Sequence, residues 1–508
     1  MSAVPVRTRE AADLLAVLDQ RFSAAAAVLL EPTPADDATR DQQPGAAAAA
    51  LLPMLLGVCY DRDRVDARWL VLTAAFGAFP TEEQLKNFGR HLELTPPAIA
   101  ESALLADVLN EPGRGRVDLP MTIVEAGTVV DTDYSARHEL HTGIQRVIRE
   151  TLPRWRAGHP VHALGWIDEY SAFRTLTPRE AARIFEYGRV GTAEMEQEAQ
   201  ATYRPRLVVP WRSVVVLAEV PHEDASGRLA ALARFSGNRL SMIGYDMIPI
   251  TSADTRPAAE ADIFAQYLTV VKHAHRLAAI SLSASHEFAG FTSELAAQGL
   301  PGPEVREVQL AGEAPRANVP RTSRRAARGV MLCVGSHEPH KNQRAALHAA
   351  ERLWREGMDF EVRLVGGKGW SDDVLQRVIE RLLAARRPLT VLGRVSDAQL
   401  IDEMQSASFV FFASRHEGYG LPVAEALACG TPVITSNFGS QAEIAALGGC
   451  LVVNPRDDDD ITAAVRRLLT DPVELERLRT EAAARPVRSW DEYAEELWDF
   501  LVASGRPG

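Results

Sequence analysis

Two long stretches of the chain alternate short apolar runs with helix-forming segments, and this alternation constrains the fold more than any other feature. The first stretch contains the strand-like runs "SVVVLAEV", "LSMIGYDMIPI" and "RLAAISLS". The second, from residue 329, contains "GVMLCVGS", "EVRLVGG", "PLTVLG", "FVFFAS", "PVITS" and "CLVVN". Strands that alternate with helices form βαβ units and mostly parallel sheets. The sequence therefore predicts two Rossmann-like α/β domains, with ligands bound in the cleft at the carboxyl ends of their strands.

Residues 1–117 have a different pattern, with Ala- and Leu-rich helical stretches and almost no strand-like run. Their longest apolar window, "GAAAAALLPMLLGVCY", is shorter than the roughly 20 residues that span a bilayer and contains Pro53, so we expect a buried helix. We predict a helical domain at 1–117, an N-terminal Rossmann-like domain at 118–322 and a C-terminal one at 323–508. The last helix, "WDEYAEELWDFLVASG", is expected to pack back, and "RTSRRAARG" at 321–329 is expected to be a linker.

Composition narrows the classes of partner. The net charge of −13 argues against nucleic acid, because proteins bind it by neutralising phosphates. The four cysteines lack the paired spacing of zinc sites and are expected to be reduced thiols of a cytoplasmic protein. The basic and apolar segment "YRPRLVVPWR" at 203–212 is a candidate for peripheral contact with the inner face of the membrane. The helical domain, to which the sequence assigns no chemistry, is a candidate for oligomerisation.

The stretch "EGYGLPVAEALACGTPVITS" at 417–436 carries the clearest chemistry. It predicts a glycine turn after a buried strand, then a short helix that starts near Pro422 and ends at Gly430. The N–H groups of residues 419–424 are expected to face an anion such as a diphosphate. Glu425, expected in the first helical turn, would accept hydrogen bonds from ribose hydroxyls, and Glu417 would meet sugar hydroxyls.

Two alternatives stay open for these glutamates. In the first, Glu425 only complements the dipole of its helix. In the second, Glu417 and Glu425 form a carboxylate pair like that of glycoside hydrolases. The second is disfavoured because Glu425 would face the same amides that attract a phosphate.

The same stretch resembles the glutamate-x7-glutamate signature of the retaining family 4 glycosyltransferases of GT-B fold. Likewise, "MLCVGSHEPHKNQRAALHA" is similar to a strand and loop of that family, found especially in polysaccharide-cluster mannosyl- and rhamnosyltransferases. "LTVLGRVSDAQL", "YDMIPI" and "HTGIQRVIRE" resemble further blocks of the family, so the resemblance covers about residues 120–505. It implies a GT-B fold, with two Rossmann-like domains facing a cleft behind the all-α N-terminal domain. The N-terminal Rossmann-like domain would hold the acceptor, and the C-terminal one the nucleotide-sugar donor.

The resemblance also implies roles for single residues. Glu417, Lys341 and Asp246 would serve catalysis, with Glu417 on the donor sugar, Lys341 on the diphosphate and Asp246 on the transferred sugar or the acceptor. Asp246 has the alternative role of capping the turn that follows it. The remaining donor-binding candidates are Gly143, Ser336, Val395, Gly418, Tyr419, Gly420, Leu421 and Glu425. Of these, Val395 would meet the base through its backbone, and Gly143 would let the backbone approach the diphosphate or the acceptor.

Departures from the family pattern put some details in doubt. Ser336 stands where many members carry an arginine, so a second phosphate cation must come from elsewhere, with Arg344 and Arg415 as candidates. Tyr245 replaces a frequent histidine before Asp246, and His340 replaces a common arginine beside Lys341.

The resulting expectation is a retaining hexosyltransferase that moves mannose from GDP-mannose to a glycan or lipid-linked glycan. UDP- and dTDP-sugar donors, a non-catalytic nucleotide-sugar-binding scaffold, and an epimerase or glycan phosphorylase of the same fold remain alternatives. No metal or other cofactor is expected. The Asp131-Thr-Asp133 sequence is similar to the Asp-x-Asp metal motif of the other transferase fold, but it directly follows the first strand, where a loop-capping role is expected.

Overall fold

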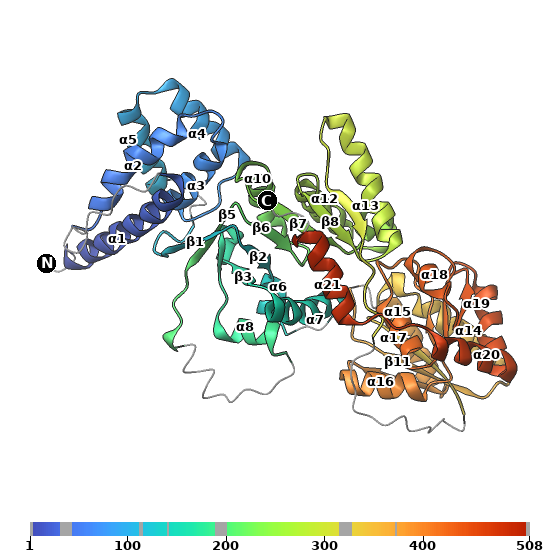
Figure 1. Cartoon of the computed structure of the whole chain (residues 1–508). Helices are drawn as coiled ribbons and strands as arrows, with labels where there is room; N and C mark the ends of the chain where they lie inside the picture. Colours follow the sequence, from blue (N-terminus) through green and yellow to red (C-terminus); the bar gives the residue numbers. More distant parts are fainter. Residues whose placement is uncertain are drawn as a thin grey trace.

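The computed structural model describes residues 4–30, 43–110, 115–139, 142–187, 201–313, 328–370 and 373–503. It has a helical N-terminal part followed by two α/β parts, as Figure 1 shows from blue to red. The helical part consists of α1 (Val4–Leu29), α2 (Ala46–Cys59), α3 (Val65–Phe76), α4 (Glu82–Leu94) and α5 (Pro97–Asn110). The apolar window forms α2, with Leu52, Leu55 and Leu56 buried. No helix in the described ranges is both long and apolar enough to cross a membrane.

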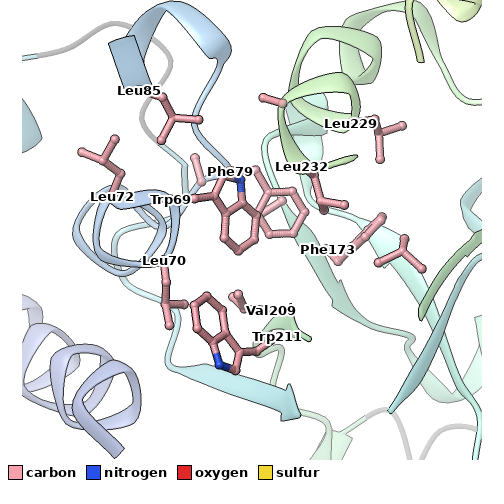
Figure 2. Packing of buried hydrophobic residues seen from close by; sticks show 14 of the residues in the cluster. Trp69, Leu70, Leu72, Phe79, Leu85, Phe173, Val209, Trp211, Leu229 and Leu232 are labelled. Carbon is pink, nitrogen blue, oxygen red and sulfur yellow. The ribbon is translucent and has the colours of Figure 1, made fainter. Parts of the chain in front are cut away.

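The helical part shares a hydrophobic core with the first sheet. Figure 2 shows Trp69 of α3 beside Phe79, with their ring centroids 5.3 Å apart. Phe79 in turn packs edge-on against Phe173 of the sheet at 5.3 Å, and Trp211 is fully buried in the same cluster. The buried Arg21 donates a 2.8 Å hydrogen bond to the carbonyl of Leu119. The helices therefore cover one face of the sheet and bury apolar side chains that would otherwise meet solvent.

The first sheet has nine strands in the order β1-β5-β4-β3-β2-β6-β7-β8-β9, and its pairs are parallel except those of β4 with β3 and β5. The strands are β1 (Met121–Glu125), β2 (Thr128–Asp131), β3 (His162–Trp166), β4 (Phe173–Thr175), β5 (Leu207–Trp211), β6 (Val214–Leu217), β7 (Arg239–Gly244), β8 (Arg276–Ala279) and β9 (Glu304–Glu307). Its helices are α6 (Asp133–Arg137), α7 (Gly143–Gly158), α8 (Pro178–Phe185), α10 (Glu223–Phe235), α11 (Ile248–Thr251), α12 (Ala258–Val271) and α13 (Leu282–Leu295), with single 3₁₀ turns at Asp168–Tyr170, Ala253–Thr255 and Ala296–Gln298.

The candidate membrane segment is part of this sheet, which corrects the expectation from sequence. Residues 207–211 form β5, which pairs with β1 in parallel and is buried along its whole length. Arg206 donates hydrogen bonds to Thr122 Oγ1 and to the carbonyl of Met121. The apolar side chains thus face the protein core, and no apolar patch is left at this segment for a membrane surface.

The second sheet has six parallel strands in the order β12-β11-β10-β13-β14-β15. They are β10 (Gly329–Val334), β11 (Phe360–Val365), β12 (Leu389–Gly393), β13 (Phe409–Phe412), β14 (Val433–Ser436) and β15 (Cys450–Val453). Their helices are α14 (Gln343–Arg355), α15 (Asp373–Ala384), α16 (Asp397–Ser406), α17 (Leu421–Ala428), α18 (Gly439–Ala445), α19 (Asp458–Thr470) and α20 (Pro472–Ala484), with a 3₁₀ turn at Pro339–Lys341. The predicted GT-B arrangement of two Rossmann-like parts is confirmed.

The last helix, α21 (Trp490–Leu501), packs on α7 and β8 of the first α/β part (Figure 1). Its stripe of Trp490, Tyr493, Leu497 and Leu501 is buried there. Trp155 of α7 donates a 2.8 Å hydrogen bond from Nε1 to the carbonyl of Ala494. The chain thus crosses between the two α/β parts twice. The boundary predicted between residues 322 and 323, with most of the predicted linker, lies outside the described residues.

Candidate active site

The carboxyl ends of the two sheets meet at the glycine turn of residues 417–420. A Cβ atom added to Gly418 would lie only 2.4 Å from the carbonyl oxygen of Tyr245, directly after β7 of the first sheet. Ser281, which follows β8, donates a 2.6 Å hydrogen bond to the carbonyl of Gly418. Tyr419 donates from its hydroxyl to the carbonyl of Leu310 at 3.1 Å. The turn therefore sits between the two α/β parts, and glycine at 418 allows the close approach.

The helix after the turn differs from the sequence expectation in two details. Gly420, at φ +105°, is the N-cap of α17, which begins at Leu421 and ends at Ala428. Glu425 therefore lies in the second helical turn and not in the first. The N–H groups of Val423 and Ala424 already bond to the carbonyl of Gly420. The N–H groups of residues 418–421, all within the described part of the chain, have no hydrogen-bond acceptor, and those of Gly420 and Leu421 lie at the N-terminus of α17, where an anion is favoured.

Two of the predicted catalytic residues, Lys341 and Glu417, form an ion pair. Lys341 Nζ lies 2.7 Å from Glu417 Oε1 and 2.9 Å from Oε2, and it also lies 5.5 Å from the ring centroid of Phe412. Burial favours the neutral acid, but the charge and hydrogen bond of Lys341, the charge of His340 and a hydrogen bond from Ser414 together lower the pKa of Glu417 below its usual value. Burial, together with the charge of Lys341, lowers the pKa of His340 to about 4, so that imidazole is neutral at pH 7.

A second pair of charged residues, His416 and Glu287, lies near Asp246. His416, directly before Glu417, lies 3.0 Å through Nε2 from Glu287 of α13 and 2.8 Å through Nδ1 from Ser252. Burial opposes the charged imidazole, yet Glu287 raises the pKa of His416. For Asp246, burial raises the pKa to about 6, although its Oδ1 accepts a 3.0 Å hydrogen bond from the N–H of Ile248. Asp246 thus caps the following turn and also lies within electrostatic reach of Glu417 and His416.

Glu425 contacts an arginine that the sequence prediction did not include. The guanidinium of Arg146 on α7 forms an ion pair with Glu425, and the exposed fractions of the two residues are only 7% and 3%. A Cβ atom on Gly143 would lie 3.5 Å from Leu421 Cδ1, so the first residues of α7 and α17 are neighbours. The sequence signal for Arg146 was its position three residues after Gly143, which puts both on the same face of a helix.

The other predicted donor residues lie at the same edge of the second sheet. Ser336, after β10, donates its hydroxyl to Glu338 Oε1 at 2.8 Å, and Arg256 of the first α/β part reaches the other oxygen of Glu338 at 3.0 Å. Val395 follows β12 and is half-buried next to α16. The structure does not place Val395 in contact with the Lys341–Glu417 pair.

The side chains of three residues considered for the donor or the sugar make other contacts. The carbonyl of Tyr245 lies against the glycine turn, but its side chain is buried in the core, where its hydroxyl donates to the carbonyl of Ala218 at 2.7 Å. Arg344 and Arg415 line a groove of about 580 Å³ beside α14 and α15, and the described lining of that groove contains neither Lys341 nor Glu417. The N–H of Arg415 bonds to the carbonyl of His340, next to Lys341. The role of either arginine as the second phosphate cation stays a prediction.

The Asp131-Thr-Asp133 sequence holds its own loop together. Asp131 accepts hydrogen bonds from the N–H of Asp133 at 3.2 Å and from Trp166 Nε1 at 2.8 Å. Burial raises the pKa of Asp131 to about 7 and that of the neighbouring Glu219 to about 8. Glu219 accepts hydrogen bonds from the N–H groups of Tyr134 and Ser135. In the part of the chain that the structure describes, no group of three His, Cys, Asp or Glu side chains fits a metal ion.

Comparison with known proteins finds relatives of this chain among glycosyl transferases. Residues 318–485 match the family "Glycosyl transferases group 1". The O-antigen chain mannosyltransferase B of Escherichia coli is 38% identical over 148 residues, which are 29% of this chain and 38% of that protein. The serotype-specific mannosyltransferase WbdA of the same species is 27% identical over 348 residues, 62% of this chain and 38% of that protein. This chain thus spans about two fifths of the length of these relatives.

A solved structure shares the fold. The Anabaena protein Alr3699/HepE in complex with UDP and glucose superposes with a TM-score of 0.52, at 12% identity, over 74% of this chain and 98% of that one. At this identity the similarity establishes the architecture alone. The helical residues before position 117 are the largest part of the chain to which the sequence resemblance does not extend.

Proposed function

We propose that this chain, whose second α/β part matches the group 1 glycosyl transferases, is a retaining hexosyltransferase. It would move mannose from GDP-mannose to a glycan or lipid-linked glycan acceptor. The observation that carries the proposal is the Lys341–Glu417 pair at the mouth of the α17 N-terminus, opposite Asp246. This arrangement combines a cation and unpaired N–H groups for a diphosphate with carboxylates for sugar hydroxyls.

The chemistry follows from these positions. Negative charge builds up on the leaving diphosphate as the glycosidic bond breaks, and the ammonium of Lys341 with the N–H groups of residues 418–421 would stabilise it. The leaving phosphate oxygen would take the proton of the acceptor hydroxyl on the same face of the sugar, which retains the anomeric configuration. Glu417 and Asp246 would orient hydroxyls of the donor sugar and the acceptor, so the protein supplies position and charge and needs no covalent nucleophile.

The choice of mannose is supported by the names of the relatives, two of which are mannosyltransferases of Escherichia coli. The nucleobase of the donor has to be identified by experiment, because its expected contact is with the backbone near Val395 and not with a side chain. UDP- and dTDP-sugars are therefore included as competing donors in the experiment.

The test measures binding and transfer separately. Thermal shifts with GDP, UDP, dTDP and their sugars, each with and without EDTA, report which nucleotide binds the folded protein. A shift selective for GDP and GDP-mannose that persists in EDTA, with mannose transfer to a glycan, is the expected result. Glu417→Gln is expected to cut transfer while GDP still binds, and Glu356→Gln, which removes an exposed carboxylate paired with Arg466, serves as control. Wild-type protein that shifts with no nucleotide and transfers no sugar would overturn the proposal.

A further inference from the structure

Arg146 and Glu425 form a buried ion pair beside the N-terminus of α17, where the donor is proposed to bind. The two residues come from different α/β parts, on α7 and on α17, and both are almost completely buried. Among the remaining contacts of Arg146 are a 3.5 Å hydrogen bond to the carbonyl of Glu313 and the ring of Trp490 at 5.9 Å. Glu425 is the carboxylate predicted to bind the ribose, so its pairing with Arg146 bears directly on donor binding.

The helix geometry brings α7, which carries Arg146, next to the N-terminus of α17, where the diphosphate is proposed to bind. Gly143 and Arg146 are three residues apart on α7, and Leu421 and Glu425 are four apart on α17, so each pair lies on one helix face. The contact of Gly143 with Leu421 joins the first turns of the two helices. The N-termini of the two helices therefore lie close together, and each favours a negative charge nearby. Lys341 on the other side is already neutralised by Glu417.

We propose that Arg146 is a donor-binding residue, which moves from Glu425 to the diphosphate of the nucleotide sugar when the donor binds. This inference rests on the proposed function. A buried ion pair is costly to break when one partner is left alone. The donor replaces both partners at once, since its diphosphate accepts hydrogen bonds from the guanidinium and its ribose hydroxyls donate to the carboxylate of Glu425. Arginine suits this exchange because its planar fork binds phosphate oxygens in a bidentate manner.

The exchange predicts a particular ligand selectivity. A nucleoside alone offers hydroxyls to Glu425 but leaves Arg146 without an anion. Pyrophosphate alone offers the anion but leaves Glu425 without a donor. A nucleoside diphosphate satisfies both groups, so its affinity is expected to exceed what the two fragments reach separately.

The experiment compares ligands and variants by isothermal titration calorimetry. The ligands GDP, guanosine and pyrophosphate are titrated into four proteins: the wild type, Arg146→Met, Arg146→Lys and Arg154→Met. If the wild type prefers UDP or dTDP, that nucleotide and its nucleoside replace GDP and guanosine. Arg154 lies on the same helix and pairs with Glu150 and Asp491, so its replacement controls for the loss of an arginine from α7. Arg146→Met is expected to weaken the binding of nucleoside diphosphate about 10- to 100-fold, as for loss of a charge-assisted hydrogen bond. The same variant is expected not to weaken the binding of nucleoside, because a nucleoside then has no Arg146–Glu425 pair to break. Arg146→Lys keeps a point charge and is expected to fall between the wild type and Arg146→Met.

The outcomes separate this inference from the proposed function. Arg146→Met leaves Glu425 buried without its partner, so the double variant Arg146→Met/Glu425→Gln is measured as well. Its stability against unfolding is expected to equal that of the wild type, while its binding of nucleoside diphosphate stays weak. Equal or tighter binding of nucleoside diphosphate by Arg146→Met would show that Arg146 only occupies the site, which overturns the inference. A parallel loss for nucleoside and nucleoside diphosphate overturns it too. Wild-type protein that binds no nucleotide overturns the proposed function, and this inference with it.

Discussion

Replacing Lys341 with methionine tests whether Glu417 depends on a single cation. The two residues are mostly buried, with exposed side-chain fractions of 19% and 10%, and Lys341 Nζ reaches both carboxylate oxygens. Methionine keeps most of the side-chain volume and removes the charge. Removal of one partner from a buried ion pair lowers the free energy of unfolding by about 3–5 kcal/mol. Because Lys341 is partly exposed, we expect the lower end of this range, about 3 kcal/mol. That loss corresponds to about 6–12 °C in the Tm of a domain of roughly 150–250 residues.

The assay is a double-mutant cycle followed by calorimetry at pH 7 and pH 5. Glu417→Gln and the double variant Lys341→Met/Glu417→Gln complete the cycle, and the double variant is expected to regain about 2 kcal/mol relative to the sum of the single variants. Without Lys341, burial is the main influence left on Glu417, so its pKa in the folded protein rises above the unfolded value. The folded state then takes up a proton that the unfolded state does not, and the deficit of Lys341→Met is expected to shrink as the pH falls towards 5.

An exposed pair in the same chain provides the control. Lys86 and Glu82 form an ion pair one helical turn apart, with exposed side-chain fractions of 53% and 37%. Lys86→Met is expected to change stability by less than about 1 kcal/mol, because solvent screens exposed pairs. The reasoning would be refuted if the losses in free energy of unfolding for Lys341→Met and Glu417→Gln simply added in the double variant. It would also be refuted if the loss of stability in Lys341→Met grew at low pH.

Three further predictions address the turn, the buried acids and the helical part. Gly418→Ala would place a Cβ atom 2.4 Å from the carbonyl of Tyr245, so we expect sugar transfer to fall at least tenfold while circular dichroism stays unchanged; normal turnover would contradict the close approach. The raised pKa of Glu219, about 8, means that the folded state binds a proton between about pH 4.5 and 8 that the unfolded state releases. Stability is therefore expected to fall as the pH rises through that window, and Glu219→Gln to flatten the fall in pH-dependent unfolding; an unchanged slope would contradict it. Deletion of residues 1–117 is expected to expose the shared core and to give a fragment that aggregates or binds a hydrophobic dye, whereas a monodisperse soluble fragment would contradict the packing in Figure 2.

The strands that were predicted from sequence differ in burial and length from those that were missed. Central parallel strands are buried on both faces, so β6, β10 and β13 are continuous apolar runs that stand out in the sequence. In contrast, β9 is "EVRE" at the edge of its sheet, half exposed and charged, and β4 is three residues long and antiparallel. Such strands depend on their neighbours for pairing and leave little local pattern.

The site shows the same division. The glycine turn and the helix that follows it were predictable, because Gly420 and Pro422 impose backbone conformations that few other residues adopt. The start of α17 was placed one residue late, and the assignment of Glu425 to its first turn was wrong. The donor roles of Glu417, Lys341 and Glu425 stay predictions, to be settled by binding and turnover measurements.

The sequence by itself determined most of the order of helices and strands, the two Rossmann-like parts and the loops that carry the candidate donor residues, because these depend on periodicity and on residues close in the chain. The GT-B arrangement was implied by the family resemblance. Only the tertiary structure decided that Arg146 meets Glu425, that His416 meets Glu287, and that the helical part shares its core with the first sheet. These contacts join residues that are far apart in the sequence. They form because folding brings two helix ends or two apolar faces together, and no local pattern in the chain specifies which distant side chain will be the partner.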